Sequence, residues 1–135
     1  MNLGNNDVDD EINKYILSFN KLFSEYIRIL STQTNLFPES YVNIITRTME
    51  NNNTKFIDMY LSNVVAKFQK DEISNDINGF IEKYTNSQNV ISKFVDTREI
   101  WKMLNNENKK KVTELFLKMY DSCDEYAFNL YLKNN

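Results

Sequence analysis

The stretch DDEINKYILSFNKLFSEYIRIL, residues 9–30, decides the fold class of this chain. Its apolar side chains recur three or four residues apart, which is the repeat of one face of an α-helix. The positions of that face are Ile12, Tyr15, Ile16, Phe19, Leu22, Phe23, Tyr26, Ile29 and Leu30. Four of residues 7–11 are acidic, at the end where the helix dipole favours negative charge. The pattern predicts an amphipathic helix from about Asp9 to Leu30.

The same repeat continues downstream in further segments. We expect helices at about residues 38–50, 55–70, 75–84, 90–95, 97–104 and 106–130. The second helix is expected to bury Tyr41, Ile44 and Ile45. The run Asn51–Thr54 indicates a connection, and the alternative is one long helix that continues through it.

Capping residues support several of these helix starts. Ser74 is the expected cap of the fourth helix, and Gly79 inside that helix costs ~1 kcal/mol relative to alanine. Asp96 and Glu99 have the spacing of a capping box. Asn105 or its neighbour is expected to start the last helix.

The last helix is long enough to lie antiparallel to the first. Two Gly and one Pro in 135 residues leave little material for tight β turns, and 135 residues suit one core. The sequence therefore predicts a single all-α domain over residues 1–135, a bundle of five to seven helices with residues 1–8 flexible.

The composition argues against many kinds of chemistry. The chain has no His, which excludes histidine-based nucleophilic catalysis and histidine metal sites. Cys123 is the single cysteine, so an internal disulfide is excluded and a reducing, intracellular compartment is expected. No phosphate-binding glycine loop or paired-cysteine motif occurs. We expect no catalytic residue, no cofactor and no metal site, and therefore no enzyme.

Residue usage is skewed toward amino acids read from A/T-rich codons. Asn, Lys, Ile, Phe, Tyr and Met supply 68 of the 135 residues. This bias indicates an A/T-rich genome and says little about function.

Two acidic segments are candidates for a metal site. Residues 74–85 align partly with a calcium-binding loop, but Ser74 and Thr85 stand where the first and twelfth ligands should be. Asp121, Asp124 and Glu125 share one helix face beside Cys123. We interpret the first segment as a capped helix start, the acids as a solvated face, and the cysteine as a packing residue.

Four residues are the candidates for contact with a partner. Trp101 is the only tryptophan, and tryptophan is enriched in interface hot spots, although core packing is its favoured role here. Lys109, Lys110 and Lys111 form the only basic run. A net charge of −3 and acidic neighbours argue against nucleic acid as the ligand.

The segment from Ile100 to Tyr120 resembles one found in small uncharacterised helical proteins of nucleocytoplasmic large DNA viruses. The shared features are Ile-Trp and Leu before a polar cap, then Asn-Lys-Lys and an amphipathic helix that ends near Leu-Tyr. Thr113 and Glu114 stand where that pattern has another aromatic residue. The resemblance implies a virus-encoded helical protein located in the host cytoplasm or the virion, and it implies no catalytic residues.

These observations favour a non-enzymatic α-helical protein that binds another protein or itself, as a giant-virus structural or accessory, host-interaction factor. The alternative is a helical bundle that binds a small ligand or uses carboxylates as an enzyme, for which Glu25, Asp58 or Glu82 would have to point inward. Self-association through a surplus apolar face is a third possibility. No apolar run approaches the ~18 residues that a membrane span requires.

Overall fold

The computed structural model describes residues 3–85 and 96–135. Over these ranges the chain forms seven α-helices and one π-helical segment, and no strand. Their bounds are α1 Leu3–Gln33, α2 Glu39–Asn51, α3 Lys55–Tyr60, η1 Leu61–Val65, α4 Lys70–Asn75, α5 Ile77–Thr85, α6 Thr97–Met103 and α7 Asn106–Asn134. The predicted all-α bundle of five to seven helices is confirmed.

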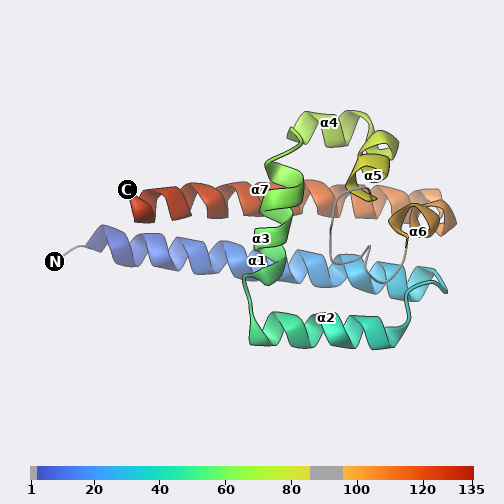
Figure 1. Ribbon diagram of the computed structural model, residues 1–135, viewed down its shortest axis with the longest axis horizontal. Coiled ribbons are helices and arrows are strands. Elements are labelled where there is room, and N and C mark those ends of the chain that lie inside the picture. The colour runs from blue at the N-terminus through green and yellow to red at the C-terminus, as the bar shows by residue number, and fades with distance from the viewer. Residues whose placement is uncertain (1–2, 86–95) are drawn as a thin grey trace.

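The two long helices, α1 and α7, lie antiparallel along the whole molecule (Figure 1). We call this pair the hairpin, although the shorter helices lie between α1 and α7 in the sequence. Near one end, Lys133 Nζ lies 2.9 Å from Asp9 Oδ1. Near the other, Asn108 Nδ2 donates a hydrogen bond to Gln33 Oε1 at 3.2 Å. The predicted antiparallel pairing of the first and last helices is therefore confirmed.

The shorter helices cover only part of this hairpin. In Figure 1, α2 runs beside α1, α3 and η1 cross the hairpin, and α5 and α6 lie near the end where α7 begins. The opposite end of the hairpin, which includes the C-terminus, extends beyond all of them. The hairpin thus has a covered half and an outer half.

In the covered half, aromatic side chains from several helices pack against one another to form the core. Phe116 on α7 is fully buried, and its ring centroid lies 4.9 Å from that of Tyr26 and 5.6 Å from that of Phe80. The hydroxyl of Tyr60 donates to the backbone oxygen of Phe116 at 2.8 Å. Each large ring contributes ~1.5–3 kcal/mol on full burial, so this cluster holds α1, α3, α5 and α7 together.

Two of the predicted caps are in place. The Asp96 carboxylate accepts a hydrogen bond from the backbone of Arg98 at 2.9 Å, at the start of α6. Asn105 does the same for the backbone of Asn108 at 2.8 Å, at the start of α7. Glu99 lies 3.5 Å from Lys102, with which it forms a salt bridge.

The helix predicted over residues 55–70 is wrong in its second half. After Tyr60 the chain widens into η1, where the Ala66 amide reaches back five residues to the Leu61 oxygen at 2.9 Å. The helix ends beyond η1, and there the Tyr120 hydroxyl on α7 donates a hydrogen bond to the backbone oxygen of Phe68 at 2.8 Å. A separate helix, α4, begins at Lys70, and the apolar repeat did not predict it.

The connection between the second and third helices is confirmed at residues 52–54, so one long helix through Asn51–Thr54 is excluded.

The prediction that Ser74 caps the next helix is wrong. It lies inside α4, and the cap of α5 is Asp76, whose carboxylate accepts from the Gly79 amide at 3.0 Å. A Cβ at Gly79 would collide with that same carboxylate. A side chain at position 79 would therefore have to displace the capping carboxylate.

The predicted inner faces need smaller corrections. On α2 the buried residues are Val42 and Ile45, whereas Ile44 is 46% exposed, because α2 rests on α1 by one narrow face. Ile27 and Ile57 are fully buried, although the apolar repeat did not predict them as inner positions.

The N-terminal bound of α1 also differs from the prediction. α1 begins at Leu3, before the predicted start at Asp9, and the expected flexibility of residues 1–8 stays a prediction. The helix expected at residues 90–95 lies outside the described residues.

Candidate functional site

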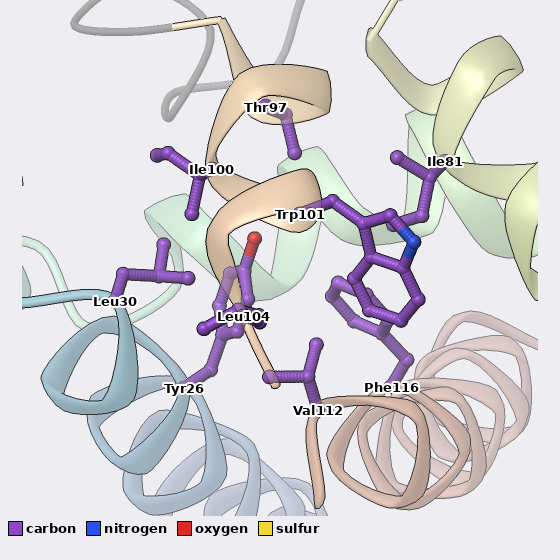
Figure 2. Close-up of a pocket in the computed structure, with 9 residues that line it drawn as sticks. All are labelled: Tyr26, Leu30, Ile81, Thr97, Ile100, Trp101, Leu104, Val112 and Phe116. Carbon is purple, nitrogen blue, oxygen red and sulfur yellow. The ribbon is translucent and has the colours of Figure 1, made fainter. Parts of the chain in front are cut away.

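Trp101, the first candidate for partner contact, is a packing residue in this structure. Its side chain is 7% exposed, and Figure 2 shows the indole among apolar side chains from α1, α5, α6 and α7. The indole Nε1 donates to Asn78 Oδ1 on α5 at 2.9 Å. The cavity beside it has a volume of about 10 Å³, close to the minimum for one water molecule. No ligand larger than water fits there.

A wider cleft lies on the solvent side of the same indole. Its volume is about 260 Å³, and the cations at its edge are Arg98, Lys102 and Lys109. Lys109 Nζ lies 5.6 Å from the centroid of the indole ring, which is cation–π distance. The sequence-predicted residues Trp101 and Lys109 therefore meet at one site.

The cations of this cleft already have acidic partners. Arg98 lies 3.2 Å from Asp96 and 3.4 Å from Glu82, and Lys102 pairs with Glu99. The hydrogen bonds from Arg98 lower the pKa of the Asp96 carboxyl. These surface pairs leave little net positive charge to attract an anion.

The lysine run does not form one basic patch. Lys110 points to solvent, and Lys111 lies 3.6 Å from Glu107 on another side of α7. The structure thus brings Trp101 together with Lys109 but not with Lys110 or Lys111. Contact of these four residues with a partner stays a prediction.

The carboxylates required by the enzymatic alternative do not converge. Glu25 and Glu82 are exposed on separate helices. Asp58 is also exposed and accepts a hydrogen bond from the Tyr126 hydroxyl at 2.7 Å. Within residues 3–85 and 96–135 no three acidic or cysteine side chains are placed to hold a metal ion.

The calcium-loop alternative and Cys123 are also resolved by the fold. Residues 74–85 lie mostly in α4 and α5, so they form no ion-binding loop. Cys123 is fully buried, its Sγ lies 3.5 Å from the backbone oxygen of Ile57, and burial raises the pKa of its thiol to about 12. Such a thiol is an unreactive packing group at neutral pH.

A second candidate surface lies on the outer half of the hairpin. We define the outer arm as residues 7–17 of α1 and 124–134 of α7. The described part of the chain has six exposed large hydrophobic side chains, and four of them are on this arm: Leu17, Phe128, Tyr131 and Leu132. The remaining two, Ile44 and Met103, lie on separate helices. Exposed apolar side chains therefore concentrate where the other helices do not cover the hairpin.

Three of these residues form one continuous strip. Phe128, Tyr131 and Leu132 stand at i, i+3 and i+4 on α7, so their side chains share a face. They are 56%, 64% and 45% exposed. We call these three residues the apolar strip. The apolar repeat did not predict the strip, because that repeat marks the face toward the core; the available signal was the apolar residues outside that face.

The outer arm is also strongly acidic. It carries six acidic and two basic residues, whereas the rest of the chain carries 13 acidic and 14 basic residues. Both of its lysines are paired, Lys133 with Asp9 and Lys14 with Glu11. Asp124 and Glu125, which precede the apolar strip by one turn, form no salt bridge with any described residue. The strip thus lies beside uncompensated negative charge.

Comparisons with known proteins do not identify a relative. No protein-family model matches the chain, and no curated protein and no solved structure is significantly similar to it. None of the helices within the described ranges is both long enough and apolar enough to cross a bilayer.

Proposed function

We propose that this chain is a non-enzymatic helical protein that acts by binding another protein through the outer arm. The observation that carries the proposal is the apolar strip of Phe128, Tyr131 and Leu132 on a part of the hairpin that no described helix covers. Large exposed apolar side chains that cluster on a surface are typical of interaction sites, whereas scattered ones need no explanation.

The chemistry of the strip suits a protein partner. Aromatic residues are enriched in interface hot spots, and Tyr131 adds a hydroxyl that can bond at the edge of a contact. The strip runs along a helix, which is the usual geometry for pairing with a second amphipathic helix.

The enzymatic alternative has less support. Glu25, Asp58 and Glu82 are all exposed and lie apart, and the cavity beside Trp101 has room for only one water molecule. The cleft of about 260 Å³ on the solvent side of Trp101 does bring polar groups together, Glu82 among them, but its Arg98 and Lys102 are already paired with acidic side chains.

The resemblance of residues 100–120 supports a narrower form of this proposal, in which the binding protein is a giant-virus structural or accessory factor in the host cell. The A/T-rich residue usage agrees with such an origin. Mass spectrometry of purified virions would separate a structural factor, which is present in them, from an accessory one, which is absent.

Site-specific photo-crosslinking tests the proposed function. A benzophenone amino acid is placed at position 128, and at position 44 on α2 as the control, since Ile44 is also about half exposed. We expect a discrete crosslinked protein in the native cell from position 128 and not from position 44. Equal yields from both positions, or only crosslinked dimers of the chain itself, would contradict the proposal.

A further inference from the structure

We infer that the partner of the outer arm presents a basic amphipathic helix, whose apolar face covers the apolar strip and whose lysines or arginines meet Asp124 and Glu125. This inference rests on the proposed function and adds the chemistry of the partner. The arm offers both features that such a helix would contact. These are a line of apolar side chains and, beside it on the same helix, a pair of carboxylates.

The two carboxylates and the apolar strip lie on one face of α7. Asp124 and Glu125 precede Phe128 by four and three residues, so they occupy the same face one turn earlier. Tyr131 and Leu132 continue that face for one more turn. A helix laid along the strip would meet the carboxylates at one end and apolar side chains at the other.

The net charge of the outer arm favours some binding partners over others. Its net charge is −4, from six acidic and two basic residues, and both lysines are already paired. A second copy that docked by the same surface would bring two arms of this charge together, which costs free energy. Anionic membranes and nucleic acids carry the same sign and are disfavoured for the same reason.

The position of the two free carboxylates argues against a purely structural role for them. Asp124 and Glu125 lie well before the end of α7, so they do not complement its dipole. Asp121, on the neighbouring turn, has a clear role because it pairs with Lys70 on α4 at 3.0 Å. Asp124 and Glu125 have no such ion pair among the described residues, as is also true of Asp7 and Asp10 on the same arm, and they differ from those two by lying beside the strip on its own helix.

Binding of designed peptides tests the inference directly. The probe is an 18-residue peptide of leucine and lysine whose leucines share one helical face, labelled with fluorescein. One control replaces every lysine by glutamate, and the other has the same composition in an order that scatters the leucines. We expect the basic amphipathic peptide to bind at least tenfold more tightly than either control.

Matched variants locate the contact. D124N/E125Q should weaken binding about fivefold at low salt, as two exposed charge pairs of ~0.5 kcal/mol each predict. E50Q/E114Q removes two other exposed acids and should leave binding unchanged. The serine variant of the strip, F128S/Y131S/L132S, should abolish binding, whereas I44S/M103S should not. Circular dichroism checks that each variant keeps its helix content.

The results separate this inference from the proposed function. If position 128 crosslinks to a protein but the acidic peptide binds as tightly as the basic one, the partner is not basic and the inference is wrong while the function stands. If D124N/E125Q and E50Q/E114Q weaken binding equally, the contact is non-specific attraction and the inference also fails. Preferential binding to vesicles of anionic lipid, or dimers of the chain in light scattering, would overturn it in favour of a membrane or a second copy.

Discussion

The two halves of the α1·α7 hairpin have the same secondary structure and opposite surroundings. In the covered half, α7 buries Phe116 completely among aromatic rings from α1 and α5. In the outer arm, the same helix leaves Phe128 56% exposed. An apolar residue in the first half stabilises the fold, whereas one in the second half is available for a partner.

The largest effect should come from truncating the two phenylalanines. F116A removes a fully buried ring and is expected to lower the free energy of unfolding by ~3–5 kcal/mol. F128A removes an exposed ring and should change the same free energy by less than ~0.5 kcal/mol. Urea denaturation followed by circular dichroism measures both. Equal losses in the two variants would show that the arm is part of the core.

Alkaline pH should act on the covered half and on its boundary with the outer arm. Burial raises the pKa of Tyr26, Tyr60 and Tyr84 above the usual value of about 10, and burial together with the Asp58 carboxylate raises the pKa of Tyr126 at the boundary. The folded state therefore keeps protons that the unfolded state loses above pH 10, so stability is intact below that pH and falls as the pH rises. The expected slope is ~1.4 kcal/mol per pH unit for each such tyrosine.

Two tyrosine variants check this pH dependence. Y60F should reduce the slope above pH 10, while Y131F, whose side chain is 64% exposed, should leave it unchanged. Urea midpoints measured between pH 8 and pH 11 give the comparison. A slope that is insensitive to Y60F would contradict the assigned cause.

One side-chain hydrogen bond joins α7 to α3 at the boundary between the two halves. Tyr126 on α7 donates to the Asp58 carboxylate on α3 at 2.7 Å. Y126F should cost ~1.5 kcal/mol, because hydrogen bonds to charged acceptors contribute more than neutral ones. D58N keeps an acceptor oxygen and should cost less. If Y126F and D58N both leave the urea midpoint unchanged, this bond does not join the arm to α3.

The smallest effects on stability are expected in α5, which lies outside the hairpin and serves as a reference for both of its halves. D76A should cost ~1 kcal/mol through loss of the cap. G79A in the native chain should change little, because its gain in helix propensity is offset when the Cβ displaces the capping carboxylate. In the D76A background, G79A should stabilise by ~1 kcal/mol. Additive effects in this double-mutant cycle would contradict the contact between the two residues.

The fold was largely predictable because the long helices are strongly periodic. The repeat in residues 9–30 and the cap at Asn105 identified α1 and α7 and their antiparallel pairing. The end of the helix after η1 was not predictable from the apolar repeat, because the chain there contacts α7, where the Tyr120 hydroxyl donates to the oxygen of Phe68. Contacts between residues far apart in the sequence leave no local signal.

The candidate site was predicted less well, for a related reason. Residue type pointed to Trp101 and the lysine run, but the indole is buried and the lysines diverge around α7. The apolar strip is made of common residues whose importance comes from which part of the hairpin is left uncovered. Periodicity shows which face is inward, and only the packing of all helices shows which outward face is free.

Hydrogen exchange of the backbone amides, measured with and without the basic amphipathic peptide, tests the central claim most directly. In the free chain, we expect residues 7–17 and 124–134 to exchange at least about tenfold faster than residues 19–30 and 112–119, which other helices cover. Adding the peptide should slow exchange in the outer arm alone. Equal exchange in both halves, or new protection centred on residues 97–111 around Trp101, would contradict the division between a stabilising half and a binding half.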